Sequence, residues 1–206
     1  MMVSEFSLGG LNFKVFDGVY IPFHDSFMLF DAVSGLDDDL GLGMDLGCGC
    51  GIVTLPLARK CKHIFAVDLN LDAVRNVIYN SLLNGLYDRI SVIYGDLLSP
   101  FMVGRIFDVI VFNPPYLPVD DYDLLVPLSL RRNWSGGLDG RQLIDRFILE
   151  FASFLGDDGV LLLVQSSLSD VDLTVKRFME LGFDVEVLDV RHFFYESISV
   201  LKVFRR

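Results

Sequence analysis

The sequence contains few cysteines and no long apolar run. Its 206 residues include three cysteines, Cys48, Cys50 and Cys61, an odd number whose spacing fits neither a disulfide framework nor a zinc site. We therefore expect reduced thiols that pack as small apolar side chains, and no metal held by this chain. No apolar stretch approaches the roughly 18 residues of a membrane span, and the first residues lack the basic and apolar regions of a signal peptide. These absences predict a cytoplasmic protein with no membrane contact.

Positive charge is also scarce. There are 17 Lys and Arg residues against 28 Asp and Glu residues, which gives a formal net charge of −11. Nucleic-acid binding relies on basic side chains that neutralise phosphates, so this balance makes nucleic acid an unfavourable partner. Four arginines that lie close in sequence, Arg131, Arg132, Arg141 and Arg146, leave open a local basic patch as an alternative to ordinary solvated side chains.

From residue 44 onward, strand and helix patterns alternate along the chain. Helices are predicted at 52–61, 71–86, 140–155 and 168–181, and strands at 44–46, 63–69, 90–96, 107–113, 159–165, 183–193 and 197–205. Near-continuous apolar strands imply that helices cover both faces of a mostly parallel sheet. Right-handed crossovers make such a sheet doubly wound, and the alternating pattern of the last two strands predicts an antiparallel end.

Residues 1–35 lie outside this alternation. The segment 6–16 predicts a small hairpin, and the second half of 19–33 has helical spacing. We therefore expect an N-terminal extension, a hairpin plus a helix, that packs on one main domain of residues 36–206. A length of 206 residues suits a single domain with one core.

A glycine-rich turn follows the first strand of the alternating pattern. In the segment DLGCGCG, Gly47, Gly49 and Gly51 alternate, and Asp45 stands two residues before them. Glycine reaches backbone angles closed to other residues and lets the chain approach a ligand. The spacing differs from the G-x-G-x-x-G of dinucleotide-binding proteins, and a helix N-terminus after it favours an anionic or carboxylate ligand. A tight turn without a ligand is the structural alternative.

Acidic residues end the next two strands. Ligands of doubly wound sheets bind beyond the carboxyl ends of the strands. Asp68 ends the strand 63–69, where a carboxylate accepts hydrogen bonds from both hydroxyls of a ribose, and Asp96 ends 90–96, where it suits the exocyclic amine of an adenine. A helix cap and an exposed turn are the alternatives for the two acids. Asn70 either caps the following helix or contacts the ligand.

An alternating glycine turn beside acidic strand ends resembles the class I S-adenosylmethionine-dependent methyltransferases over residues 44–206. The resemblance implies a Rossmann-like α/β fold with a doubly wound, seven-stranded, mostly parallel sheet and an antiparallel C-terminal strand. It also implies that Asp45 and the glycines hold the methionine part of the methyl donor, that Asp68 holds the ribose, and that Asp96 with Leu97 holds the adenine.

The segment Asn113-Pro114-Pro115-Tyr116 follows the strand 107–113 and therefore faces the same edge of the sheet. Such a motif implies a planar nitrogen as the nucleophile, an amide or an aromatic amine, whose delocalised lone pair makes it dependent on orientation. The Asn113 side-chain oxygen and the Pro114 carbonyl can each accept one N–H, which favours the positive charge that grows on the nitrogen. The prolines fix φ, and Tyr116 offers a face for stacking. A loop stop with an exposed tyrosine is the alternative.

The N-P-P-Y motif resembles two groups, the adenine amino-methyltransferases of nucleic acids and the HemK/PrmC-like protein-glutamine methyltransferases. Three further segments resemble the eukaryotic and archaeal branch of the second group. They are VYIPFHDSFMLFDAV (19–33), WSGGLDGRQLIDRFI (134–148) and ESISVLKVFR (196–205). Nearly the whole chain is thus covered by the resemblance.

The resemblance implies N5-methylation of the glutamine in the Gly-Gly-Gln motif of a class 1 release factor, S-adenosylmethionine as the methyl donor, and a heterodimer with a small zinc-binding activator subunit. Within this pattern, the expected catalytic residues are Asn113, Pro114, Pro115 and Tyr116. The expected cofactor-binding residues are Ser26, Asp45, Gly47, Gly49, Gly51, Asp68, Asn70, Asp96, Leu97 and Asn113. Gly136, Gly137 and Arg141 are expected in a loop beside the substrate entrance.

Two positions depart from the family pattern, and two other functions stay open. Ile21 and His24 stand where the family usually has acids, which puts the role of those acids at the cofactor mouth in doubt. An adenine-N6 methyltransferase acting on DNA or RNA would place a flipped base in the same Asn-Pro-Pro-Tyr pocket. A scaffold subunit that binds the cofactor without catalysis is the third possibility. The charge of −11 and the W-x-G-G segment favour the protein-glutamine methyltransferase.

Overall fold

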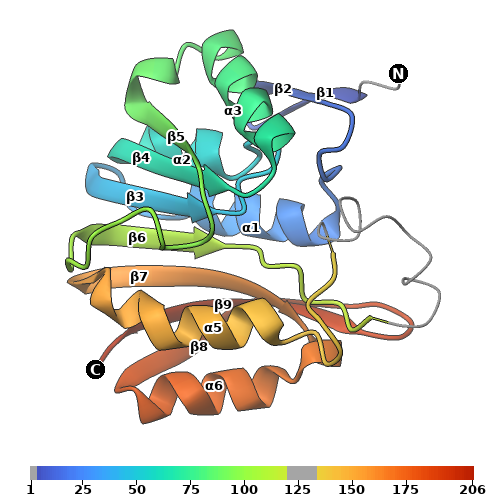
Figure 1. Ribbon diagram of the computed structural model, residues 1–206, viewed down its shortest axis with the longest axis vertical. Coiled ribbons are helices and arrows are strands. Elements are labelled where there is room, and N and C mark those ends of the chain that lie inside the picture. Colours follow the sequence, from blue (N-terminus) through green and yellow to red (C-terminus); the bar gives the residue numbers. More distant parts are fainter. Residues whose placement is uncertain (1–3, 120–133) are drawn as a thin grey trace.

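The computed structural model describes residues 4–119 and 134–206. Within these residues, seven strands form one sheet in the order β5-β4-β3-β6-β7-β9-β8 (Figure 1). The strands are β3 (Leu40–Leu46), β4 (Cys61–Asp68), β5 (Ile90–Tyr94), β6 (Phe107–Phe112), β7 (Leu155–Ser166), β8 (Phe183–His192) and β9 (Ser197–Arg205). Strands β3 to β7 pair in parallel, and β9 runs antiparallel to both of its neighbours. The predicted doubly wound sheet with an antiparallel C-terminal strand is confirmed.

Helices cover both faces of this sheet. They are α1 (His24–Ser34), α2 (Thr54–Lys60), α3 (Leu71–Leu83), α5 (Gln142–Glu150) and α6 (Val171–Glu180). In Figure 1, α5 and α6 lie in front of the sheet and α1 and α2 lie behind it, and α2 contacts both α1 and α3. The crossovers run outward from β3 toward β5 on one side and from β6 toward β7 on the other, so right-handedness places the two helix groups on opposite faces.

The hydrophobic core surrounds the central strands of the sheet, because these strands are apolar on both faces. All but one residue of β6 are buried, and β6 lies between β3 and β7 in the sheet. Complete burial of a Val, Ile or Phe side chain contributes about 1.5–3 kcal/mol, so this apolar run is stable only with both faces covered. The three cysteines are free and buried, as predicted. None of the helices in the described residues combines the length and apolarity that crossing a bilayer requires.

The element boundaries differ from prediction mainly at the helices. The helix expected over 52–61 begins at Thr54, which puts Pro56 in its first turn, where the missing N–H has no helical partner to lose. The helix expected over 140–155 ends at Glu150 and continues as a 3₁₀ turn over Phe151–Ser153. Strand β7 starts at Leu155, four residues earlier than expected, because its first residue pairs with Phe107 across a register shift.

The predicted N-terminal hairpin is present as β1 (Ser4–Leu8) and β2 (Leu11–Val15). Gly9 and Gly10 both have positive φ, +57° and +70°, as a two-residue type I′ hairpin turn requires. The hairpin does not join the large sheet; it packs beside α3 (Figure 1).

Three asparagines spaced by four residues, Asn76 and Asn80 on α3 and Asn84 at its C-cap, attach this hairpin to α3. Their side-chain oxygens accept hydrogen bonds from the backbone N–H groups of Phe16, Lys14 and Asn12 at 2.8, 3.0 and 2.8 Å. Their amide nitrogens donate back to the carbonyls of Lys14 and Asn12. Side chains therefore pair with the outer edge of β2. The segment after β2 reaches the cavity at the carboxyl ends of the large sheet, where Tyr20 and Pro22 line it.

Candidate active site

A cavity of about 800 Å³ opens at the carboxyl ends of β3, β4 and β6. Twelve of the predicted site residues line it: Ser26, Asp45, Gly47, Gly49, Asp68, Asn70, Asp96, Leu97, Asn113, Pro114, Pro115 and Tyr116. Gly51 does not line the cavity. It has φ +85°, a backbone conformation that favours glycine, and a Cβ there would make ordinary contacts with Val77 and Thr54 at 3.4 and 3.8 Å.

The glycine turn is fixed by the strand beside it. The backbone N–H groups of Gly47 and Cys48 both donate to the Val67 carbonyl, at 2.8 and 3.1 Å. The N–H of Gly49 donates to Oδ2 of Asp68 at 2.9 Å. Gly47 and Gly49 have φ values of +68° and +53°, which a side chain would disfavour. The turn and the acid at the end of β4 therefore form one rigid unit.

Asp45 is 3% exposed, and Thr54 donates its hydroxyl to the Asp45 carboxylate. Burial, together with the negative charge of Asp68, raises the pKa of Asp45 to about 7, while the Thr54 hydrogen bond acts in the opposite direction. A buried acid with a raised pKa gains from a nearby cation, which restores the ionised form. The position therefore suits a ligand that carries positive charge.

Asp68 and Asn70 make different hydrogen bonds at the end of β4. Asp68 Oδ1 accepts the Asn70 backbone N–H at 2.8 Å, and Oδ2 accepts that of Gly49. Burial raises the pKa of Asp68. Asn70 caps α3 through its oxygen, which accepts from the Asp72 N–H at 3.0 Å, and its amide donates to the Gly18 carbonyl at 2.8 Å. The helix cap expected as an alternative for Asn70 is therefore present, and both ends of its amide are engaged.

Asp96 is paired with an arginine that lies far away in sequence. Nη1 of Arg146, on α5, donates to Oδ2 of Asp96 at 2.8 Å, and both residues line the cavity. Leu97 follows with φ +48° and is buried. A left-handed backbone is uncommon outside glycine and is often found at functional sites. The pair of residues expected at the adenine thus borders the cavity in a constrained turn.

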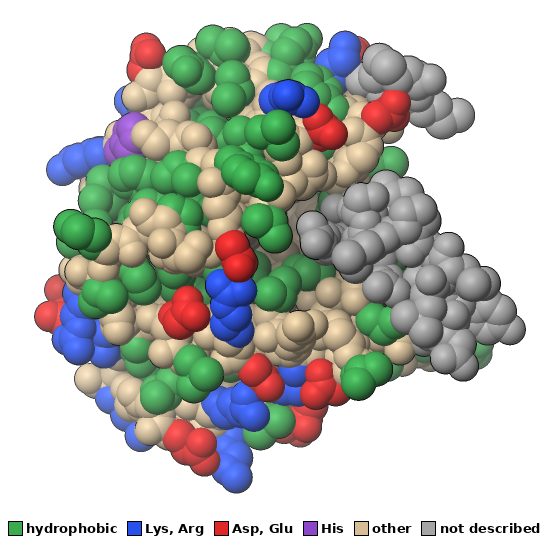
Figure 2. All heavy atoms as spheres, viewed as in Figure 1, with side chains coloured by type: hydrophobic (Ala, Val, Ile, Leu, Met, Phe, Trp, Pro, Cys, Tyr) green, Lys and Arg blue, Asp and Glu red, His purple; other side chains and the backbone are tan. Residues whose placement is uncertain are grey.

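The basic patch considered for Arg131, Arg132, Arg141 and Arg146 does not form from the arginines that the structure describes. Arg141 is 4% exposed and donates to the carbonyls of Ser169 and Asp170 and to Asp145, and Arg146 pairs with Asp96. Figure 2 shows basic and acidic side chains interleaved over α5 and α6. Arg131 and Arg132 lie outside the described residues.

Asn113 stands at the end of β6 with its two amide atoms in different environments. Its Nδ2 donates to Oδ2 of Asp25 at 2.9 Å, whereas its Oδ1 is buried and accepts no hydrogen bond from the described residues. An unpaired buried acceptor costs about 1–3 kcal/mol. The hydroxyl of the buried Tyr116 also approaches Oδ2 of Asp25, at 3.3 Å. The motif therefore offers one oriented acceptor beside an aromatic ring.

A second loop backs the N-P-P-Y segment. The Leu117 N–H donates to the Trp134 carbonyl at 2.9 Å, and the Gly136 N–H donates to the Leu117 carbonyl at 2.8 Å. A Cβ on Gly136 would overlap the Gly140 backbone, and a Cβ on Gly140 would overlap the Tyr116 carbonyl. Gly137 lines the cavity. The W-x-G-G loop is thus packed directly behind the motif, and of the three residues expected beside a substrate entrance, Gly137 lines the cavity whereas Gly136 and Arg141 do not.

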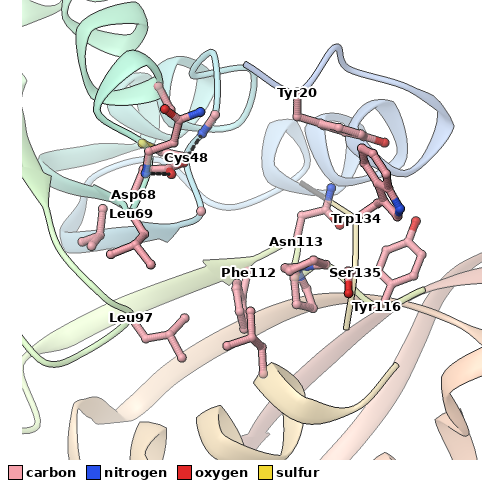
Figure 3. A pocket seen from close by; sticks show the side chains of 18 of the residues that line it. Tyr20, Cys48, Asp68, Leu69, Leu97, Phe112, Asn113, Tyr116, Trp134 and Ser135 are labelled. Carbon is pink, nitrogen blue, oxygen red and sulfur yellow. Dashed lines mark hydrogen bonds between the residues drawn. The ribbon is translucent and has the colours of Figure 1, made fainter. Parts of the chain in front are cut away.

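Two groups of side chains face each other across the cavity. Figure 3 shows Asp68, Leu69 and Leu97 on one side and Tyr20, Asn113, Tyr116 and Trp134 on the other. We call the first group, with the glycine turn, the donor half, because it includes the residues predicted to hold the methyl donor. We call the second group, with Asp25, the acceptor half, because it includes the residues predicted to hold the methyl acceptor. Sequence reasoning gave no role to Tyr20, Asp25, Trp134 and Arg146 in the lining. All four lie in the segments 19–33 and 134–148, which resemble the family. That resemblance was the sequence feature that could have marked them as site residues.

The two residues that depart from the family pattern, Ile21 and His24, lie next to lining residues in sequence but do not line the cavity themselves. Ile21 is exposed, and His24 is the first residue of α1. The His24 ring packs between Phe23 and Phe193, with centroid distances of 4.3 and 5.0 Å. These two positions therefore present apolar and aromatic groups where the family pattern has acids.

The fold and the strand-end site define a class I methyltransferase, and comparisons with known proteins agree. The methyltransferase small domain family matches residues 29–126. MJ0928 of Methanocaldococcus jannaschii, which carries a provisional name as a protein N5-glutamine methyltransferase, is 35% identical over 95% of this chain and 96% of that protein. The chain therefore belongs to the protein N5-glutamine methyltransferases.

Two further relatives come from eukaryotes. The eRF1 methyltransferase catalytic subunit mtq2 of Schizosaccharomyces pombe is 26% identical over 95% of this chain and 93% of that protein. The structure of the E. cuniculi Mtq2–Trm112 complex, responsible for methylation of the eRF1 termination factor, contains a chain with a TM-score of 0.70 and 27% identity, covering 92% of this chain and 99% of that one. By contrast, this chain spans 41% and 60% of two bacterial release factor glutamine methyltransferases that it matches.

Proposed function

We propose that this protein transfers a methyl group from S-adenosylmethionine to the side-chain nitrogen of the glutamine in the Gly-Gly-Gln motif of a class 1 release factor. The observation that carries the proposal is Asn113, which lines the same cavity as the glycine turn and whose buried Oδ1 has no hydrogen-bond partner among the described residues. Release factor methylation by relatives of similar length supports the choice of substrate. A substrate that acts on the ribosome places the reaction in the cytoplasm.

The donor half fits the methyl donor by its charges and its shape. When bound, S-adenosylmethionine supplies an electrophilic methyl group on a sulfonium. Asp45 would meet the positive part of such a ligand, since its raised pKa gains from a cation. Asp68 keeps acceptor capacity for ribose hydroxyls, because a carboxylate accepts about four hydrogen bonds and two come from backbone N–H groups. Asp96 and Leu97 would border the adenine.

The acceptor half fits a primary amide. Asn113 Oδ1 would accept one N–H of the glutamine side chain, and the Pro114 carbonyl would accept the other. Two acceptors hold the NH₂ plane and stabilise the positive charge that develops as the new carbon–nitrogen bond forms. The proton then leaves to solvent after transfer, so no strong base is needed in the cavity. Tyr116 and Trp134 would close the aromatic wall beside the amide.

The test is a transfer assay with labelled methyl donor and purified release factor, followed by mass spectrometry of the Gly-Gly-Gln peptide. We expect one added methyl group on the glutamine, and none on a factor whose motif is changed to Gly-Gly-Ala. DNA and RNA are assayed in parallel. Label on nucleic acid with none on the release factor would overturn the proposal in favour of adenine-N6 methylation, which the charge of −11 disfavours.

We further propose that a small zinc-binding activator subunit assembles with this chain. The E. cuniculi relative was solved as a complex with a second protein, Trm112. Among the described residues, no group of three or more His, Cys, Asp and Glu side chains is placed to hold a metal, so the zinc would belong to the partner. Co-expression with candidate subunits should yield a one-to-one complex that holds zinc, and a fully active chain alone would contradict this proposal.

A further inference from the structure

Asp25 is a buried carboxylate surrounded by donors. It is 4% exposed and lies in the first turn of α1. Its oxygens accept from the Ser26 N–H at 2.7 Å, the Ser26 hydroxyl at 3.2 Å, the Tyr20 hydroxyl at 3.3 Å, the Asn113 amide at 2.9 Å and the Tyr116 hydroxyl at 3.3 Å. Within the described part of the chain, no Lys or Arg forms an ion pair with it. Each of its close partners donates a hydrogen bond.

This environment fixes which way the Asn113 amide faces. An ionised carboxylate only accepts hydrogen bonds, whereas a side-chain amide has one donor end and one acceptor end. If the amide were turned over, its oxygen would face the carboxylate and two acceptors would repel each other. Asp25 therefore holds Nδ2, and Oδ1 is left at the other end of the amide, where it has no partner among the described residues.

The two tyrosines support the same polarity. Burial, and then the negative charge of Asp25, raises the pKa values of Tyr20 and Tyr116 far above the ordinary value of a phenol. Both hydroxyls therefore stay protonated and donate toward the carboxylate. The two tyrosines thus add donors around Asp25, which leaves its oxygens as acceptors for the Asn113 amide nitrogen.

We propose that Asp25 is a positioning residue for methyl transfer: it locks the Asn113 side chain with Oδ1 turned toward the substrate NH₂. The proposal deepens the function proposed above and rests on it for its kinetic readout. In this role Asp25 acts through Asn113, to which it is hydrogen-bonded. It supplies the orientation that two prolines fix for the backbone but cannot fix for the asparagine side chain.

An asparagine at position 25 would not serve in its place. The Ser26 N–H donates to Oδ1 of Asp25, and Asn113 donates to Oδ2. An amide has one acceptor oxygen, so it would satisfy either Ser26 or Asn113. If it satisfied Ser26, its NH₂ group would face the NH₂ of Asn113 and favour a turned-over Asn113. The Asp25→Asn variant keeps the volume and changes the orientation.

The first test compares Asp25→Asn with Asp31→Asn, a matched charge removal at an exposed site on the same helix. We expect Asp25→Asn to lower kcat about tenfold to hundredfold, the range typical for partners that orient a functional group. The KM for the methyl donor should stay within about twofold of wild type on the same reasoning. Asp31→Asn should leave kcat unchanged. An Asp25→Asn variant with wild-type kcat would overturn the proposal.

The second test asks whether Asp25 acts only through Asn113. Combined with Asn113→Ala, the Asp25→Asn change should add no further loss in kcat, because the group that it orients is already gone. Losses that multiply would show a role independent of Asn113. Circular dichroism and thermal unfolding of each variant separate a kinetic loss from misfolding.

A swapped pair tests the orientation directly. Asn113→Asp alone places two carboxylates together and should lose nearly all activity. In the double variant Asp25→Asn with Asn113→Asp, the amide oxygen now at position 25 can accept from Ser26 while the NH₂ there donates to the new carboxylate, which still turns one oxygen to the substrate. We expect the kcat of the double variant to be at least about tenfold higher than that of Asn113→Asp, the lower end of the effect typical for partners that orient a functional group. No recovery would count against the geometry.

Side-chain amide NMR keeps the proposal testable if the wild-type protein shows no transfer to any release factor. The Asn113 NH₂ resonances are assigned by their loss in Asn113→Ala. One of the two protons should be shifted downfield by its carboxylate partner and should move upfield in Asp25→Asn. Inactivity with this shift would refute the proposed function and leave the positioning role intact, whereas Asn113 resonances that ignore the change at residue 25 would refute the role itself.

Discussion

The two halves of the cavity are built in different ways. In the donor half, each functional group stands within a few residues of a strand end, and Asp68 is held by N–H groups of the turns that follow β3 and β4, those of Gly49 and Asn70. In the acceptor half, Asn113 is held by Asp25, which is 88 residues away in sequence. The first half is a product of local sequence and sheet topology, and the second depends on three separate segments meeting.

This difference suggests how one fold serves many methyl acceptors. The donor half forms wherever parallel strands end in a glycine turn and two acids, so it can stay the same while the substrate changes. The acceptor half is assembled from the segment after β2, the end of β6 and the loop before α5, which lie outside that unit. Changes in these segments alter what is methylated without altering the donor site.

The largest expected effect comes from breaking the acceptor half alone. Asn113→Ala should lower kcat about 10²–10³-fold, the range seen when one preorganised polar group that stabilises developing charge is removed. Binding of the methyl donor, measured by calorimetry, should stay near the wild-type value. Asn12→Ala, a hairpin asparagine outside the cavity lining, serves as the control. Full turnover by Asn113→Ala would remove the basis of the proposed mechanism.

Breaking the donor half alone should give the opposite pattern. Asp68→Ala should weaken methyl-donor binding about a hundredfold, because hydrogen bonds to a charged group contribute about 1.5–3 kcal/mol. Asp72→Ala, four residues on at an exposed position of α3, should bind the donor normally. If both variants bound the donor equally well, the ribose role assigned to Asp68 would be wrong.

The same contrast explains what the sequence predicted and what it missed. The order of strands and helices, the hairpin and the strand-end acids were predictable because they follow from local periodicity and from sheet topology. The bond between Asp25 and Asn113 was not, because spacing says nothing about which distant side chains meet. Of the three glycines predicted at the cofactor, Gly47 and Gly49 line the cavity and Gly51 does not, because an alternating motif does not reveal which glycine faces a cavity.

Loosening the wall behind the acceptor half tests whether that wall matters. Gly140→Ala introduces a Cβ that overlaps the Tyr116 carbonyl, whereas Gly182→Ala meets nothing within 4 Å, and both sites have positive φ, +73° and +85°. Both variants therefore carry similar backbone strain, about 1–2 kcal/mol. Only Gly140→Ala should lose a further 1–3 kcal/mol or so from overpacking and a parallel loss in kcat. Equal unfolding free energies for the two variants would show that the loop yields freely.

The smallest expected effect is a pH dependence confined to the donor half. Burial raises the pKa of Asp45 to about 7 in the free protein, so Asp45 is mostly protonated below that pH and mostly ionised above it. A cationic methyl donor favours the ionised form, so binding below pH 7 must release a proton. Affinity for the donor should therefore fall by up to about tenfold for each pH unit below 7 and level off above it.

Asp45→Asn isolates this contribution from the other titrating groups. The variant should bind the donor more weakly than wild type at pH 8 and show a flatter profile between pH 6 and 8, because the amide does not ionise. The proton released by wild type on binding at pH 6 can be measured directly by calorimetry in two buffers of different ionisation enthalpy. A profile that stays steep in Asp45→Asn would assign the pH dependence to another titrating group and leave Asp45 with a packing role.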